Sequence, residues 1–187
     1  RGSFNSLIQV VTLLMAAVGS GVAVRVFFRF EAILKVTKTG AQEINLSDAR
    51  HIVTIESPTE YVLQPKLSLI RQREVGRHTP SFDQALRDAL REDPDVLMVG
   101  ELREPETMRL TLNAAETGHL VFTTVHSSTC AEALQRIVAA FPAEVQGGIC
   151  AQLADCLVAV VSQRLTYRAD LGMLIPECEI LMASSAT

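Results

Sequence analysis

The order of apolar and polar positions predicts alternating strands and helices from residue 51 onward. His51–Ile55 is a β-branched run closed by Glu56, which is typical of a strand that ends in a turn. Ser81-x-x-Gln84 is a capping box, and the apolar residues after it recur on one helical face, at Phe82, Ala85, Leu86, Ala89 and Leu90. Asp93-Pro94 ends that helix. Val96–Val99 then predicts a strand covered on both faces.

The same alternation continues through the second half of the chain. Pro105 suits the first turn of a helix whose end is marked by Thr117-Gly118, and Leu120–Val125 is a third strand closed by His126. A further helix follows a cap at Ser127, Ser128 or Thr129, with its inward positions at Ala131, Leu134, Ile137 and Val138. Apolar runs at 157–161 and 177–181 predict two more strands. Strands that alternate with helices predict an α/β fold, a mostly parallel sheet with helices on both faces.

The first 50 residues have a different pattern, so we divide the chain into an atypical segment, 1–50, and a domain, 51–187. No residue from Gly2 to Val24 is charged, and residues 7–24 form an apolar run without an intact phosphate-binding motif. This run is compatible with a buried strand plus loop, with a membrane segment, or with a sequence that does not reflect a normal fold. The polar stretch Gly40–Asp48 predicts a loop at the junction.

Composition narrows the class of protein. The chain has 187 residues, 48% of them hydrophobic and 20% charged, which excludes a disordered or low-complexity chain. Its 17 basic and 21 acidic residues give a net charge of −4, so no basic field indicates a nucleic-acid partner. No two of the four cysteines are spaced as CxxC, which argues against a zinc module.

Three predicted strands each end in a titratable residue, Glu56, Glu101 and His126. Ligands of open parallel sheets bind outside the carboxyl ends of the strands, so these residues are predicted to converge on one edge. A carboxylate pair there suits Mg²⁺ held together with substrate phosphates, and it suits a base that orients water for attack on phosphorus. The alternative is that polar residues end the strands only because the chain leaves the core there.

The chain resembles the motor domain of the type IV pilus retraction ATPases and, more broadly, the type II and type IV secretion ATPases. The resemblance covers about residues 52–183 and rests on these blocks: TIESPTEYV (54–62), QREVGR (72–77), ALRDALREDPDVLMVGELREPET (85–107), AAETGHLVFTTVHS (114–127), RIVAAFPAE (136–144) and SQRL (162–165). It implies a RecA-like P-loop NTPase core that hydrolyses ATP with Mg²⁺, to power pilus retraction (twitching motility) or related secretion.

The resemblance also implies roles for single residues. Glu56 would lie at the metal and its waters in an acidic box, although Ser57 stands where the family usually has Asp. Glu101, at the end of an atypical Walker B strand, would hold the metal through water and act as the base that orients the attacking water. The stretch TGHLVFTTVH (117–126) resembles the histidine-containing motif of the family, and His119 and His126 match its two histidines. They lie at opposite ends of a strand, about 20 Å apart, so only His126 is expected to reach the γ-phosphate, and His119 to support the structure.

Arg87 and Arg91 lie four residues apart on the predicted helix and therefore share one face. The resemblance implies that they point at phosphates or at a neighbouring subunit, because a planar guanidinium suits phosphate oxygens. The alternative is an ordinary solvated face.

The sequence departs from the family at the phosphate-binding loop. No G-x-x-x-x-G-K-[ST] string exists; the nearest fragment is Gly19-Ser20-Gly21, followed by Val22 and Ala23 where Lys and Ser/Thr are needed. Loss of one comparable stabiliser of developing charge costs about 10²–10³ in rate. We therefore expect weak hydrolysis, or alternatively a nucleotide-incompetent ring subunit or scaffold of the same family. A third alternative is an assembly factor anchored in the membrane by residues 2–24.

The resemblance further implies an assembly and a location. A homo-oligomeric, hexameric ring is expected in the bacterial cytoplasm, peripheral to the inner membrane and in contact with a pilus platform protein. The distal helices of the family are expected to be missing beyond about residue 181.

Overall fold

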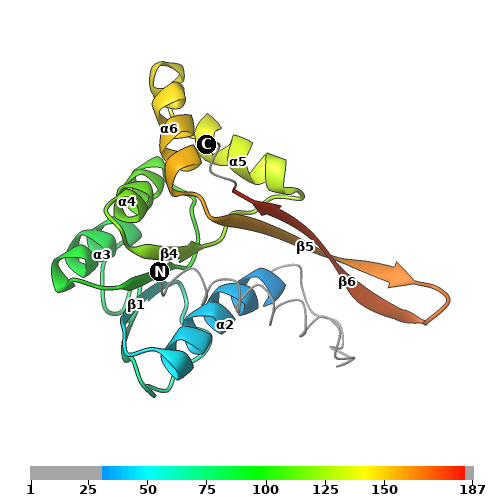
Figure 1. Ribbon diagram of the computed structural model, residues 1–187, viewed down its shortest axis with the longest axis horizontal. Coiled ribbons are helices and arrows are strands. Elements are labelled where there is room, and N and C mark those ends of the chain that lie inside the picture. Colours follow the sequence, from blue (N-terminus) through cyan, green and yellow to red (C-terminus); the bar gives the residue numbers. More distant parts are fainter. Residues whose placement is uncertain (1–30, 184–187) are drawn as a thin grey trace.

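The structure, a computed structural model, describes residues 31–183, with residues 31–37 and 39 described only as part of a helix. Four strands form a parallel sheet in the order β2-β1-β3-β4, with β1 at His51–Glu56, β2 at Leu69–Glu74, β3 at Val96–Val99 and β4 at Leu120–Thr123. The helices are α2 (Glu31–Ser47), α3 (Phe82–Ala89), the short 3₁₀ helix η1 (Leu90–Glu92), α4 (Pro105–Glu116), α5 (Cys130–Ala139) and α6 (Ala143–Cys156). The predicted α/β fold with a parallel sheet between helices is confirmed (Figure 1).

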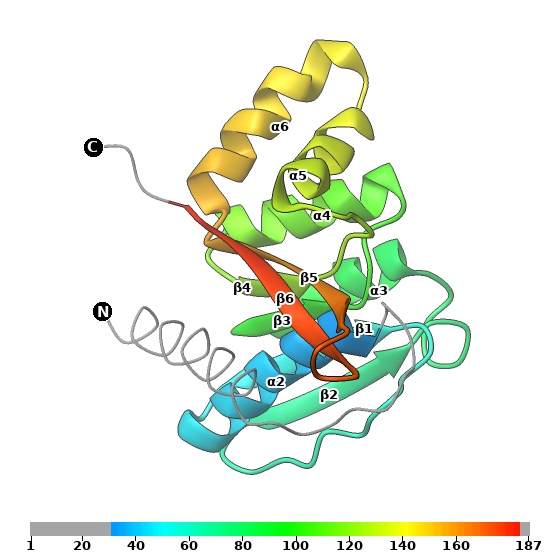
Figure 2. The same ribbon diagram turned by 90° about the vertical axis from the view of Figure 1, so that its right-hand side faces the viewer.

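Side chains of β1 alternate between the two faces of the sheet, and each face has its own helices (Figure 2). Val53 and Ile55 belong to the larger apolar core, which the helices α3, α4, α5 and α6 cover. Ile52 lies on the opposite face with Val96, against Ala41 and Ile44 of α2. Both faces of the central strands are therefore buried, as their continuous apolar runs predicted.

The loop predicted at Gly40–Asp48 is wrong, because most of this stretch forms the second half of α2. Ala41, Ile44 and Asn45 recur at helical spacing and are fully or almost fully buried against the sheet. The polar Asn45 is tolerated there because its amide donates to the Gln64 carbonyl and accepts from the Lys66 amide. Tertiary contacts thus satisfy a residue that in the sequence alone indicates a turn.

The helices on the other face begin and end largely where the sequence indicated. Ser81 caps α3 by accepting a hydrogen bond from the Gln84 amide, and Pro105 opens α4. Gly118 follows α4 with a φ of 100°, a backbone conformation that favours glycine. The prediction that Ala131 faces inward from α5 is wrong, because Ala131 is exposed. The buried residues of that helix are Cys130, Ala133 and Ile137.

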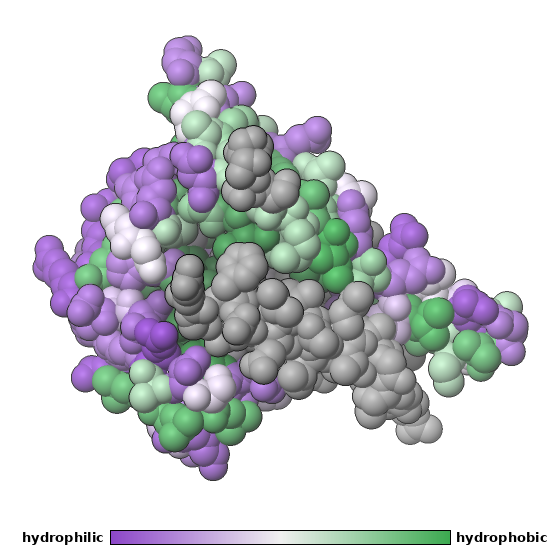
Figure 3. Space-filling view, in the orientation of Figure 1, coloured by the Kyte–Doolittle hydropathy of each residue, from purple (hydrophilic) through white to green (hydrophobic). Residues whose placement is uncertain are grey.

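The last two strands do not extend the parallel sheet. β5 (Ala159–Arg168) and β6 (Met173–Met182) pair antiparallel as a separate hairpin, which projects from the body of the molecule (Figure 1). Its base is fixed to the start of α5, where the Cys130 amide donates to Glu179 and the Ser162 hydroxyl donates to the Ser128 carbonyl. The space-filling view shows hydrophobic side chains among hydrophilic ones on the projecting part (Figure 3).

Two predictions from the first 50 residues fall outside the described part of the chain. These are the phosphate-loop fragment Gly19-Ser20-Gly21 and the alternatives for the apolar run at 7–24. Within residues 31–183, no helix combines the length and the apolar character needed to span a bilayer.

Candidate active site

The three residues predicted to converge lie at one edge of the sheet. Glu56 ends β1, Glu101 follows β3 after Gly100, and His126 follows β4; β1, β3 and β4 are parallel neighbours. The Gly100 amide donates to the Ile55 carbonyl at 2.8 Å, which continues the sheet ladder up to the site. The prediction of a shared edge is confirmed.

Glu101 and His126 form a pair at this edge. His126 Nε2 lies 3.5 Å from Glu101 Oε2, and Arg103 Nε lies 2.8 Å from the same oxygen. The Glu101 side chain is 16% exposed and that of His126 is 44% exposed, so the pair is open to solvent on one side. A carboxylate next to an imidazole, both in reach of water, is a suitable arrangement for proton transfer.

The backbone around the pair is held by hydrogen bonds between the two strand ends. The Thr124 hydroxyl donates to the Gly100 carbonyl at 2.6 Å, and the Leu102 amide donates to the Thr124 carbonyl at 3.0 Å. Arg136 of α5 donates to the His126 carbonyl. These contacts fix the loops that carry both side chains, so the geometry of the pair is set by the sheet and by α5.

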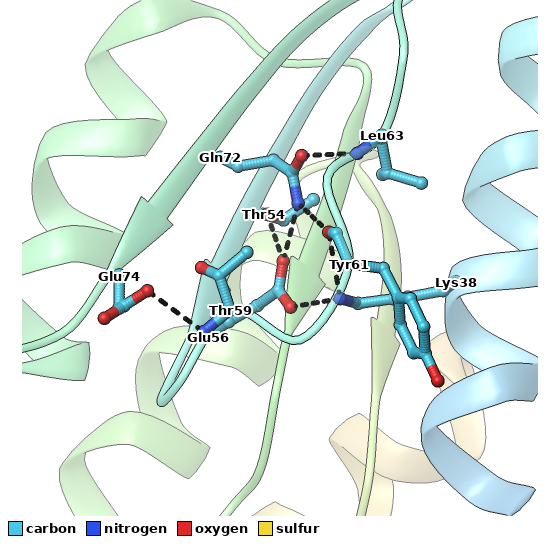
Figure 4. Close-up of polar contacts among 8 residues, drawn as sticks. All are labelled: Lys38, Thr54, Glu56, Thr59, Tyr61, Leu63, Gln72 and Glu74. Atoms are coloured by element: carbon cyan, nitrogen blue, oxygen red, sulfur yellow. Dashed lines mark hydrogen bonds and ion pairs between the residues drawn. The ribbon is translucent and has the colours of Figure 1, made fainter. Parts of the chain in front are cut away.

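Glu56 lies at the same edge but in a closed environment (Figure 4). Its side chain is on the α2 face of β1 and only 2% exposed. Oε1 accepts from the Thr54 hydroxyl at 2.8 Å and from Gln72 Nε2 at 3.1 Å, while Oε2 lies 2.6 Å from Lys38 Nζ of α2. Both carboxylate oxygens are therefore engaged by protein groups.

The residues at this edge do not fit the Mg²⁺ site predicted from Glu56 and Glu101. Mg²⁺ needs a near-octahedral shell and keeps several waters, but Glu56 has almost no exposed surface and already faces an ammonium group. The ion pairs of Glu101 with Arg103 and His126 both use Oε2. In the range 31–183 no three His, Cys, Asp or Glu side chains are grouped as metal ligands.

Two other predicted residues lie at the opposite, amino-terminal edge of the sheet. His119 precedes β4, and its Nδ1 lies 2.9 Å from the Ala114 carbonyl and 3.1 Å from the Thr117 hydroxyl at the end of α4. Arg91 is exposed in η1, which adjoins the start of β1, since His51 Nδ1 lies 3.2 Å from the Glu92 carbonyl. Neither residue joins Glu101 within this chain.

Asp95 also marks the amino-terminal edge, as its place before β3 indicated. It accepts from the His51 amide at 2.8 Å and pairs with Arg50 at 3.2 Å. The backbone hydrogen bond from His51, with the neighbouring Arg50 charge, lowers the pKa of this carboxyl below its ordinary value. Asp95 is thus ionised and structural, at the far end of the strand from Glu101.

Arg87 of α3 is half-exposed and pairs with Glu106 of α4, which also binds Arg109 at 2.8 Å. The hydrogen bond from Arg109 is the main cause that lowers the pKa of Glu106. Within this chain Arg87 therefore has a carboxylate partner on the next helix. Roles for Arg87 and Arg91 toward phosphate or a neighbouring subunit remain predictions.

Sequence reasoning missed Lys38 and Gln72 as neighbours of the site. The signal available for Glu56 was the alternation along β1, which places Thr54 and Glu56 on one face. No comparable signal existed for Lys38, because its helix was not predicted, nor for Gln72, because β2 was not predicted. Both become neighbours of Glu56 only through the pairing of β1 with β2 and the packing of α2.

The parallel sheet between helices, with an acid and an imidazole at the carboxyl ends of adjacent strands, defines an α/β protein whose candidate site lies at the edge where such sheets bind their ligands. The particular family follows from comparison with known proteins. Residues 17–180 match the family described as type II/IV secretion system protein, and the chain belongs to that family.

Individual relatives agree with this assignment. The chain is 50% identical over 143 residues to a twitching motility protein of Neisseria gonorrhoeae, and 46% identical over 143 residues to the type IV pilus retraction ATPase PilT of Pseudomonas aeruginosa. Each alignment covers 76% of this chain, and the chain spans 38% and 41% of the length of these relatives.

Solved structures give the same picture. The crystal structure of the pilus retraction motor PilT with bound ADP superimposes with a TM-score of 0.76 at 44% identity, over 81% of this chain and 44% of that one. The VirB11 ATPase of the Brucella suis type IV secretion system, at 19% identity and a TM-score of 0.63, shares the fold. The chain therefore spans less than half of the length of each of these relatives.

Proposed function

We propose that this chain is the ATP-hydrolysing part of a motor that powers type IV pilus retraction, or related secretion. The observation that carries the proposal is the Glu101–His126 pair at the carboxyl ends of β3 and β4, separated by 3.5 Å. The identity to retraction ATPases and the fold shared with an ADP-bound motor support the choice of nucleotide.

In this proposal Glu101 is the base and corresponds to the acid of an atypical Walker B strand. Water is oriented by the carboxylate, its oxygen attacks the γ-phosphorus, the bond to the β–γ bridging oxygen breaks, and ADP leaves. Both ion pairs of Glu101 use Oε2, so Oε1 is the oxygen that we assign to the water proton. His126 lies beside the carboxylate and on the solvent side, where it can donate a hydrogen bond to the developing phosphate charge.

The remaining binding groups are proposals carried over from the sequence. Gly19, Ser20 and Gly21 would line the phosphates, and Arg87 and Arg91 would face a neighbouring subunit of a homo-oligomeric, hexameric ring. That ring would lie in the cytoplasm at the inner membrane, against a pilus platform protein. Sedimentation of the chain with and without ATP would test the ring, because a hexamer and a monomer differ sixfold in mass.

A second candidate function, a nucleotide-incompetent subunit or scaffold, is favoured by two observations. The sequence lacks the Lys and Ser/Thr of a phosphate-binding loop, and the Glu56 carboxylate is closed off by Lys38. Under this alternative the fold and its interfaces would be kept while hydrolysis is lost.

A nucleotide titration separates the two functions. For the motor we expect saturable ATP binding with a dissociation constant below about 1 mM. We also expect slow phosphate release, because a missing phosphate ligand lowers the rate by about 10²–10³. Isothermal titration and a phosphate-release assay measure the two quantities. Absence of binding at millimolar ATP would instead establish the scaffold.

A further inference from the structure

A buried ion pair connects α2 to the carboxyl-terminal edge of the sheet. Lys38 is 6% exposed and Glu56 is 1% exposed, and Nζ lies 2.6 Å from Oε2. Charged side chains are rarely buried to this degree unless they are paired, so each of the two accounts for the burial of the other. Figure 4 shows the ammonium group of Lys38 directed from α2 toward the carboxylate.

Tyr61 and Gln72 provide further polar contacts to the two charged groups. Lys38 Nζ also donates to the Tyr61 carbonyl at 3.3 Å and lies 5.2 Å from the centre of the Tyr61 ring, within the range of a cation–π contact. Gln72 joins the same elements, since its Nε2 donates to Glu56 at 3.1 Å and to the Tyr61 carbonyl at 2.9 Å. Its Oε1 accepts from the Leu63 amide at 2.6 Å. The ion pair is therefore part of a polar network that joins α2, β1, β2 and the loop between the two strands.

This network leaves no role for Glu56 toward a cation from solution. One negative charge faces one positive charge at direct contact, and a divalent ion at the same carboxylate would lie beside the ammonium and be repelled by it. We propose that Lys38 is an internal counter-ion that replaces a divalent cation at Glu56. Glu56 in this chain is therefore a positioning residue that anchors α2, and it binds no metal.

This inference matters for ATP hydrolysis only if the proposed function holds. Its test measures metal binding in the absence of nucleotide, so the two can fail separately. Mn²⁺ is titrated into the full chain and free Mn²⁺ is followed by electron paramagnetic resonance. We expect Glu56→Gln to leave the Mn²⁺ affinity of the chain unchanged. An affinity that falls tenfold or more in Glu56→Gln would overturn the inference, whether or not the chain hydrolyses ATP.

The variant Lys38→Met exposes the carboxylate to solution ions. Removing one partner of a buried ion pair lowers Tm by about 10 °C. We expect Lys38→Met to gain one Mn²⁺ site that Lys38→Met/Glu56→Gln loses again, and 10 mM Mg²⁺ to raise Tm in Lys38→Met alone. Equal Mg²⁺ effects in the natural chain and in Lys38→Met would contradict the proposal. Should Lys38→Met not fold, the Glu56→Gln titration decides alone.

The control variant is Lys66→Met, the same substitution at an exposed side chain on the neighbouring loop. Only the backbone amide of Lys66 donates to Asn45, so this bond survives the change. We expect Lys66→Met to bind Mn²⁺ as the natural chain does. A new Mn²⁺ site in Lys66→Met would assign the effect to net charge and overturn the specific role of Lys38.

Discussion

Replacing Glu101 by Gln is expected to lower ATP turnover by about 10²–10⁴ and to leave ATP binding nearly unchanged. Glutamine keeps the size of the side chain but cannot take the proton of the attacking water. The contact to His126 can persist as a neutral hydrogen bond, so the loops after β3 and β4 should keep their positions. Phosphate release under saturating ATP, with isothermal titration of ATP, measures the two effects separately.

The matched control for this prediction is Glu104→Gln, in the same loop. Glu104 is exposed and precedes α4 without a side-chain capping bond, so its charge has no place in the pair. We expect turnover in Glu104→Gln to equal that of the natural chain. Natural turnover in Glu101→Gln would remove the base from the mechanism, and equal losses in both variants would point to loop charge instead.

Replacing Gly100 by Ala is expected to destabilise the protein by roughly 1–3 kcal/mol and to lower turnover about tenfold. A Cβ at this position would lie 3.2 Å from the Ile55 carbonyl oxygen and 3.4 Å from the Glu56 Cα, both atoms of the neighbouring backbone. The strands must separate by a few tenths of an ångström to accept it, and Glu101 moves with them. Urea unfolding and phosphate release measure the two losses.

Gly148→Ala is the matched control, with an expected effect of opposite sign. Gly148 lies inside α6, where an added Cβ would meet no atom within 4 Å beyond its chain neighbours and the nearby backbone of its own helix. Alanine there should stabilise the helix by up to about 1 kcal/mol, because glycine is the poorer helix former. If Gly100→Ala proved as neutral or stabilising as Gly148→Ala, the close approach of β1 and β3 would not position Glu101.

The site was predictable where its residues close continuous apolar runs. The apolar run Val96–Val99 predicts a strand buried on both faces, and Glu101 follows this strand after Gly100. Because parallel strands end at one edge, the order of the motifs was enough to group Glu101 with His126. The place of His119 at the other edge also follows from its sequence position, immediately before β4.

The environment of Glu56 could not be predicted in the same way. The burial of Glu56 depends on Lys38, which lies 18 positions earlier in the chain, in a helix that the sequence did not predict. It also depends on Gln72, which lies in a strand with few apolar residues. Likewise, the apolar run at 157–161 predicted a strand but not its partner. Local sequence does not determine whether a strand joins the parallel sheet or pairs with the next strand as a hairpin.

The sequence by itself determined the alternation of strands and helices, the edge on which Glu101 and His126 meet, and the resemblance to the motor family. Local spacing and chain direction are sufficient for these because a parallel strand has only one carboxyl end. The tertiary structure alone decided which charges neutralise each other. A carboxylate at the end of a strand can hold a metal, a proton or an ammonium group, and only the packing of α2 on the sheet placed Lys38 against Glu56.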